Sequence, residues 1–192
     1  MRTTEERGRA TNASPAQHPS RGGCNVSIAQ EEARRNAGVR IPVEAEGVHE
    51  ELKSFDHWVV WKAIPKDGGK IDKWPYNARS GELASTRDSR TWSTFEEALS
   101  TYARNGWDGL GFVFSSGDPF TGIDFDKVRN PETGAVDGWV REWLDTFDGY
   151  AEVSPSGKGI HVLIKGKATS RKGATIEVYS LERFFAITGV RP

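Results

Sequence analysis

The chain has 192 residues, 36% of them hydrophobic, and its 26 basic and 27 acidic side chains give a net charge of −1. Its apolar runs are far shorter than the roughly 20 residues of a membrane-spanning helix, and its arginine-containing start lacks the apolar stretch of a secretory signal. Cys24 is the single cysteine, so an intrachain disulfide and a thiolate-rich zinc site are excluded. We therefore expect a soluble protein of a reducing compartment, the cytoplasm, with no membrane partner.

Aromatic residues divide the chain into two parts. The seven Trp, nine Phe and four Tyr residues all lie between Phe55 and Phe185. A segment without them buries too little apolar surface to offset its ordering entropy. The sequence predicts a disordered arm over 1–45, a short helical lead-in over 44–54, and one folded domain over 50–192.

The periodicity of the aromatic part predicts strands interrupted by two helices. Strands are expected at 57–63, 71–76, 110–114, 120–126, 150–153, 160–165, 175–179 and 183–188, the last two as a closing pair. A capping box of Ser93 and Glu96 predicts a helix ending at Asn105, and Asp137 begins a second with apolar positions up to Phe147. This order indicates an α+β or mixed α/β domain.

The first candidate motif is the strand segment 122–126, Gly-Ile-Asp-Phe-Asp. Side chains two residues apart in a strand share a face, so Asp124 and Asp126 point the same way. Two adjacent carboxylates repel each other, and a divalent cation such as Mg²⁺ or Mn²⁺ relieves that repulsion. The simpler interpretation is a strand end with two solvated acids.

The second motif is the turn 154–161, Ser-Pro-Ser-Gly-Lys-Gly-Ile-His. Its small residues can present backbone N–H groups to phosphate oxygens, Lys158 adds a positive charge, and His161 can donate from the next strand. The simpler interpretation is a polar hairpin turn followed by a buried histidine. The third motif is Glu177, a lone acid in the apolar strand 176–179. It is either an ordinary surface residue or a third metal ligand.

Taken together, these motifs resemble the archaeo-eukaryotic primase superfamily, and within it the primase–polymerase (prim-pol) domains of phage and plasmid replication proteins. Asp124-Phe125-Asp126 matches the family's D-h-D motif, 154–161 its serine- and glycine-containing motif ending in His, and Ile176-Glu177 its apolar-acidic motif. The flanks at 58–62, 73–77, 84–86, 91–98, 183–185 and 188–189 are also similar. The resemblance covers about 52–190 and departs from the family at 179–182, where relatives often have an Asp-containing turn.

The resemblance implies a primase–polymerase core in which an N-terminal αβ unit packs against a half like the RNA-recognition motif, with a cleft between them. The implied activity is template-directed nucleotidyl transfer by two Mg²⁺ or Mn²⁺ ions held by Asp124, Asp126 and Glu177. The implied nucleotide-binding residues are Ser154, Ser156, Gly157, Lys158, His161 and Arg183. Candidates for phosphates of the template or nucleotide are Lys73, Arg79 and Arg87, and Trp74 or Tyr76 are candidates for base stacking.

The implied partners are a single-stranded DNA template, ribo- or deoxynucleoside triphosphates, and a helicase domain or subunit. Two other functions stay open: a catalytically silent single-stranded DNA-binding module and a metal-dependent DxD glycosyltransferase. The latter would leave Glu177 and the 154–161 turn unexplained. The sequence also leaves open the balance of priming and polymerisation, the preferred sugar, and whether the chain is a piece of a larger replication protein.

Overall fold

The computed structural model describes residues 42–104, 106–147 and 149–192. Most of the expected arm, residues 1–41, lies outside this part. The end of the arm differs from expectation, because Val43 and Ala45 pack against the main hydrophobic core. The Glu44 backbone N–H also donates to the Thr188 carbonyl at 2.7 Å. The folded part therefore includes residues 43–45, ahead of the expected boundary.

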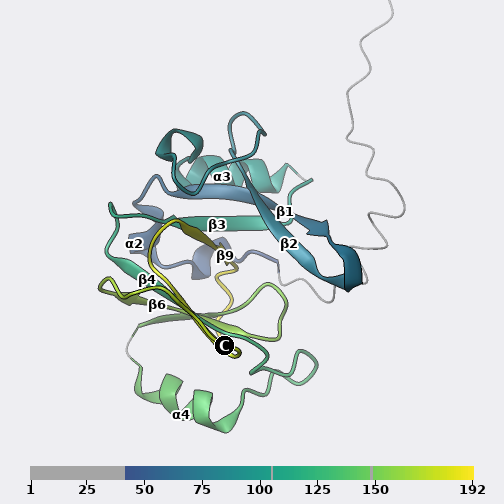
Figure 1. The fold of residues 1–192 in the computed structure, drawn as a ribbon, viewed down its shortest axis with the longest axis vertical. Coiled ribbons are helices and arrows are strands. Elements are labelled where there is room, and N and C mark those ends of the chain that lie inside the picture. Colours follow the sequence, from purple (N-terminus) through teal and green to yellow (C-terminus); the bar gives the residue numbers. More distant parts are fainter. Residues whose placement is uncertain (1–41, 105, 148) are drawn as a thin grey trace, which may run out of the picture.

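Two antiparallel sheets form the described part of the chain (Figure 1). Sheet A has the strand order β2-β1-β3-β9, and sheet B has the order β5-β6-β4-β8-β7. The strands are β1 (Trp58–Pro65), β2 (Ile71–Tyr76), β3 (Gly109–Phe114), β4 (Phe120–Phe125), β5 (Tyr150–Val153), β6 (Ile160–Lys165), β7 (Arg171–Lys172), β8 (Ile176–Tyr179) and β9 (Arg183–Ile187). The helices are η1 (Ala45–Gly47), α2 (Glu50–Lys53), η2 (Asp67–Gly69), η3 (Ser89–Thr91), α3 (Phe95–Ala103) and α4 (Gly138–Thr146). The expected mixed α/β class is confirmed.

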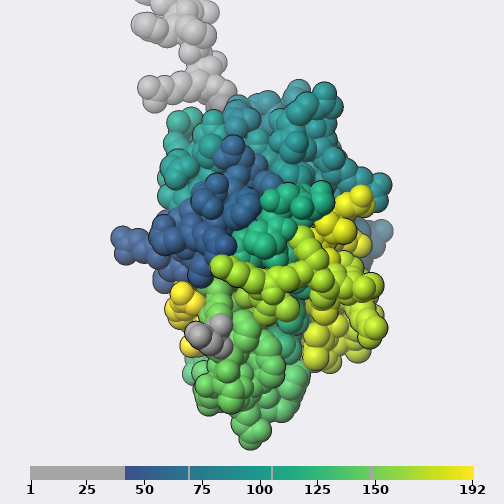
Figure 2. Space-filling view, turned by 90° about the vertical axis from the view of Figure 1, so that its left-hand side faces the viewer, coloured from purple at the N-terminus to yellow at the C-terminus, as the bar shows by residue number. Residues whose placement is uncertain are grey.

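The two sheets lie between two outer helices. Figure 1 shows α3 on the outer side of sheet A and α4 on the outer side of sheet B. Phe95 and Ala98 of α3 are buried against sheet A, and Val140 of α4 is buried against sheet B. Figure 2 shows the same division from another side, with blue and teal residues above and green residues below. The core beneath α3 also includes Phe120, Tyr150 and Leu163 of sheet B, so part of sheet B packs on the same face of sheet A.

Aromatic rings join the two sheets where β4 passes beneath β3 and β9. The rings of Phe114 and Phe185 meet edge to face, with centroids 5.2 Å apart. A Cβ at Gly122 of β4 would come within 2.6 Å of Phe185 and 2.7 Å of Phe114. Such distances are far inside van der Waals contact, so glycine allows this close approach. The glycine that opens the first sequence motif thus serves packing.

The expected closing pair of strands is wrong. β8 pairs with β4 and β7 in sheet B, whereas β9 pairs with β3 in sheet A. The three residues 180–182 carry the chain from one sheet to the other, and Glu182 has a positive φ of 55° there. Alternation of apolar residues predicts a strand but not its partner, and a short connection is compatible with a hairpin or with a passage between sheets.

The capping box of α3 lies one residue later than expected. Thr94 accepts from the Glu97 backbone N–H at 3.2 Å, and Glu97 accepts from the Thr94 backbone N–H at 3.0 Å. Ser93 is buried and exchanges backbone hydrogen bonds with Trp58 of β1, so it is still part of the sheet. Among the described residues, no helix has both the length and the apolar character needed to cross a lipid bilayer.

Candidate active site between the two sheets

Groups from all three sequence motifs meet in one row across sheet B. In the antiparallel register, Asp124 of β4 lies opposite His161 of β6 on one side and Glu177 of β8 on the other. The row continues with Glu152 of β5 opposite His161, and with Lys172 of β7 opposite Glu177. Directly opposed residues of an antiparallel pair share a face, with Cβ atoms about 5 Å apart. The row therefore places three carboxylates, an imidazole and an ammonium group on the face opposite α4.

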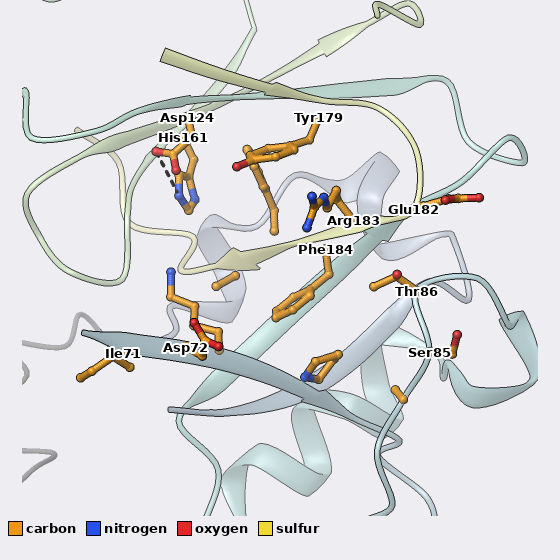
Figure 3. A pocket seen from close by; sticks show the side chains of 15 residues that line it. Ile71, Asp72, Ser85, Thr86, Asp124, His161, Tyr179, Glu182, Arg183 and Phe184 are labelled. Carbon is orange, nitrogen blue, oxygen red and sulfur yellow. Dashed lines mark ion pairs between the residues drawn. The ribbon is translucent and has the colours of Figure 1, made fainter. Parts of the chain in front are cut away.

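A cavity of about 610 Å³ lies between this row and sheet A. Asp124 and His161 line it from sheet B, and Ile71 and Lys73 line it from β2. Figure 3 shows Asp124, His161 and Tyr179 projecting from one side toward the strand that carries Ile71. The volume is in the range of small-molecule sites, and both walls contribute polar groups.

A second cavity of about 240 Å³ lies next to the first. Asp124 and Asp126 both line it, together with Ser154, Ser156 and Lys73. The two aspartates of the first motif thus face the same space as the serines of the second. Glu177 borders neither cavity; it lies one strand away and forms an ion pair with Lys172 at 3.5 Å.

The imidazole of His161 is held on three sides. Its Nε2 lies 3.7 Å from Oδ1 of Asp124, and its Nδ1 lies 3.2 Å from Oε1 of Glu152. The ring stacks on Phe185 of β9, with centroids 4.6 Å apart and planes inclined by 25°. Only 4% of the side chain is exposed. The sequence motif identified this histidine but not what holds it.

Glu152 is a buried carboxylate that our sequence analysis missed. Its side chain is 0% exposed and accepts hydrogen bonds from the Tyr150 hydroxyl at 2.6 Å and from the backbone N–H groups of Thr188 and Gly189 at 3.0 and 2.8 Å. Burial and the charge of Glu152 raise the pKa of Tyr150 well above its usual value, so the phenol remains a donor. The signal was present: like Glu177, Glu152 is a lone acid in a short apolar strand.

Lys73 faces the acidic row from sheet A. Its side chain is exposed to the cleft, where loss of hydration between the cleft walls lowers the pKa of its ammonium group. The negative charges of Asp124, Asp126 and Glu152 act in the opposite direction and favour the charged form. Lys73 therefore lies in the field of the acids, at the place where an anionic ligand would enter between the sheets.

The glycine-rich turn uses most of its polar groups to hold its own shape. Ser154 accepts from the Gly159 backbone N–H at 3.1 Å and contacts Ser156 Oγ at 3.0 Å. The Gly157 and Lys158 backbone N–H groups also bond within the turn. Ser156 and Lys158 are exposed, whereas Ser154 is buried. The backbone N–H groups expected to be free are therefore engaged, and the side chains of Ser156 and Lys158 are the exposed polar groups of the turn.

The turn is packed tightly against the end of β4. A Cβ at Gly159 would approach the Phe125 carbonyl oxygen to 2.6 Å, so this position requires glycine. Arg129 supports the turn from the other side by donating to the Gly157 carbonyl at 2.8 Å. These contacts fix the turn beside Asp126, which follows β4 directly.

The three arginines suggested by the sequence have different surroundings. Arg183 lines the 610 Å³ cavity, and its guanidinium lies 5.9 Å from the Tyr179 ring centroid. Arg87 forms an ion pair with Glu182 at 2.7 Å and is exposed at the rim. Arg79 binds Glu97 of α3 and lines neither cavity. Arg79 therefore stabilises the position of α3 and does not border the cleft.

The candidate stacking residues do not face the cleft. Trp74 and Tyr76 alternate with Lys73 along β2, so their side chains lie on the opposite face of sheet A. Tyr76 packs against the Trp107 ring at 5.2 Å as part of the core, and Trp74 is 42% exposed. Neither ring is a stacking surface for a base held beside Asp124.

The carboxylates suit a hard divalent cation in their chemistry. In the described part of the chain, no group of three His, Cys, Asp or Glu side chains is already gathered around one ion position. Mg²⁺, however, is usually held by one or two carboxylates, several waters and substrate phosphates rather than by an all-protein cage. Asp124 and Asp126, which line one cavity, supply such a pair. The residues therefore fit a cation that arrives with a phosphorylated substrate.

Fold and site together define a mixed α/β domain with an acidic row, an adjoining histidine and an opposing lysine in a cleft between two antiparallel sheets. No family model matches the chain. Over 146 residues the chain is 36% identical to the DNA primase-polymerase of Nitratiruptor phage NrS-1, a match covering 72% of this chain and 20% of that protein. The chain is thus related to a phage primase-polymerase, and it spans about a fifth of that relative's length.

Proposed function

We propose that this chain is a catalytic domain for template-directed nucleotidyl transfer and acts as a DNA primase, a DNA polymerase or both in phage, plasmid or mobile-element replication. The observation that carries the proposal is the register of sheet B, in which Asp124 lies between His161 and Glu177 beside a cavity of about 610 Å³. The similarity to a primase-polymerase of a phage supports it.

We assign Asp124, Asp126 and Glu177 to the binding of Mg²⁺ or Mn²⁺ ions. Two such ions, when bound, would activate the attacking 3′-hydroxyl and neutralise charge on the leaving pyrophosphate. Asp124 and Asp126 face one cavity, and Glu177 approaches from the neighbouring strand. The repulsion among these acids favours cation binding and gives the site its negative field.

Around the acids, cationic and hydroxyl groups would hold the triphosphate. His161 and Ser156 line the same cavity as the two aspartates, Lys158 is exposed on the same turn as Ser156, and Lys73 lies across the cleft. Charge-assisted hydrogen bonds to phosphate oxygens are the strong class of such contacts. Arg183, at the other end of the 610 Å³ cavity, would bind the nucleotide there, and the exposed Arg87 would contact template phosphates. Participation of a helicase domain or subunit belongs to the same proposal.

The test is incorporation of labelled nucleotide on single-stranded DNA, with and without a primer, comparing Mg²⁺ with Mn²⁺. D124N, D126N and E177Q should each reduce incorporation by at least about 100-fold, because each removes a charge that holds the ions. Their melting temperatures should change little, since each change relieves repulsion among the acids, and the ion pairs of Asp126 and Glu177 with exposed lysines contribute little. The matched control is D145N, which alters an exposed acid of α4 on the other face of sheet B.

Retained incorporation in the D124N/D126N double variant would overturn the proposal. DNA affinity without incorporation by the unaltered chain would favour a silent DNA-binding module. Turnover of a sugar nucleotide without template would instead favour a glycosyltransferase.

A further inference from the structure

Glu152 is ionisable, fully buried and outside the set of groups that the proposed reaction uses. A buried carboxylate is costly unless hydrogen bonds compensate for the lost hydration. Glu152 has four such partners, and they are divided unequally between its two oxygen atoms. Oε2 accepts from the Tyr150 hydroxyl and from the backbone N–H groups of Thr188 and Gly189. Oε1 contacts His161 Nδ1 at 3.2 Å.

This division separates a structural role, in which Oε2 links the two sheets, from a second role, in which Oε1 holds His161. The contacts of Oε2 already attach β5 to the segment that follows β9, so they account for a link between the sheets. They do not require the histidine. Oε1, by contrast, is directed at an imidazole whose other nitrogen, Nε2, lies 3.7 Å from Asp124 in the cleft. A carboxylate on one ring nitrogen fixes both the rotation of the ring and the nitrogen that carries hydrogen.

We infer that Glu152 is a positioning residue for the reaction, which holds His161 with hydrogen on Nδ1 and with Nε2 turned toward the nucleotide in the cleft. This inference rests on the proposed function for what His161 binds, but not for how His161 is held. Phe185 restricts the ring from its face, while Glu152 restricts it within its plane. Because Oε2 binds the backbone at 188–189, the same carboxylate links the end of sheet A to the orientation of His161.

The substitution E152Q tests the inference with little change of shape. Three donors point at Oε2, so the amide oxygen of the new side chain should take that place and its NH₂ group should face His161. An NH₂ donor requires Nδ1 to accept, so Nδ1 can no longer carry hydrogen. The matched control is Y150F, which removes one donor from Oε2 and leaves the contact of Oε1 intact.

The first measurement is the ¹⁵N spectrum of the His161 ring in the full 192-residue chain without nucleotide, assigned with H161A. We expect hydrogen on Nδ1 in the unaltered chain and in Y150F, and its loss in E152Q.

The second measurement is steady-state incorporation, in which E152Q should lower kcat/KM for nucleotide by about 10- to 100-fold, the range known for partners of site histidines. Y150F should change it by less than about 3-fold. In the H161A background, E152Q should add less than about 2-fold, because its effect passes through the histidine.

A His161 spectrum that is the same in E152Q and the unaltered chain would overturn the inference and leave Glu152 as a link between sheets only. If E152Q does not fold, the unaltered chain decides: Nδ1 without hydrogen is incompatible with donation to Glu152. Absence of incorporation by the unaltered chain would count against the proposed function alone, since the spectrum still reports how His161 is held.

Discussion

The two walls of the cleft are both antiparallel sheets, but they carry opposite chemistry. On sheet B, all five residues of the row from Glu152 to Lys172 are ionisable. On sheet A, the facing side is an apolar cluster that includes Trp61, Ala63 and Ala186, with Lys73 beside it. The comparison teaches that one wall concentrates negative charge, while the other excludes water and offers a cation.

The ion pair between Asp118 and Lys167 joins the two sheets, and its removal should have the largest effect on stability. Asp118, in the turn between β3 and β4, accepts from Lys167 at 2.9 Å and lies 3.5 Å from His57 Nδ1; its side chain is 0% exposed. D118N would leave Lys167 without its charged partner and should lower the free energy of unfolding by about 3 kcal/mol. That corresponds to a fall in Tm of roughly 6–12 °C. The control, D72N, removes an exposed acid that also pairs with a lysine and should cost less than about 1 kcal/mol.

Low pH should weaken the same ion pair by protonating Asp118. Burial raises the pKa of Asp118, but contacts with His57, Lys167 and two backbone N–H groups outweigh burial and lower it below its usual value. A depressed folded-state pKa stabilises the protein above the unfolded pKa of about 4, and this contribution is lost as pH falls through the folded value. Chemical unfolding across this acid range should therefore show a smaller pH dependence for D118N than for the unaltered chain. Parallel curves would exclude Asp118 as a source of acid sensitivity.

The second way to test the comparison is to remove the cation from the apolar wall. K73M keeps the length of the side chain but removes the charge that faces Asp124 and Asp126. If this ammonium binds phosphate, KM for nucleotide should rise by about 10- to 100-fold, equivalent to one charged hydrogen bond. K62M is the matched control, because Lys62 lies on the outer face of the same sheet over the Trp107 ring. Equal effects of the two substitutions would remove Lys73 from the binding site.

The smallest effect is expected outside both walls. Arg79 forms an exposed bidentate ion pair with Glu97 and donates to the Trp92 carbonyl. R79A should lower stability by about 0.5–1 kcal/mol and leave incorporation within about 2-fold. A large loss of DNA binding in R79A would show that the template extends over α3, beyond the cleft.

Local features were predictable from the sequence, since they depend on neighbours along the chain. The strands around Asp124 and His161 and the turn between 154 and 159 follow from alternation and glycine placement. The juxtaposition of Glu177 with Asp124 followed only from resemblance, because no periodicity encodes which strands pair. For the same reason, the expected pairing of β8 with β9 is wrong, because the two strands belong to different sheets.

The roles of residues that depend on partners remote in the sequence are harder to predict. Glu152 gains its importance from backbone donors at 188–189 and from His161, all remote in sequence. The partner of Arg79 is Glu97, 18 positions away, and no local pattern in the sequence indicates this pair. The alternation of Trp74 and Tyr76 with Lys73 already excluded a shared face, so this part of the prediction could have been corrected from the strand pattern alone.

The short passage from β8 to β9 limits how far the two sheets can separate at that edge. Residues 180–182 limit the distance from the Tyr179 Cα to the Arg183 Cα to at most about 14 Å. The two sheets are therefore held close together along this edge. Lys73 and the serines at 154 and 156 border the smaller cavity at the other side. A ligand beside Asp124 and Asp126 therefore meets Lys73 and these serines in the smaller cavity, whereas Tyr179 and Arg183 border only the larger one.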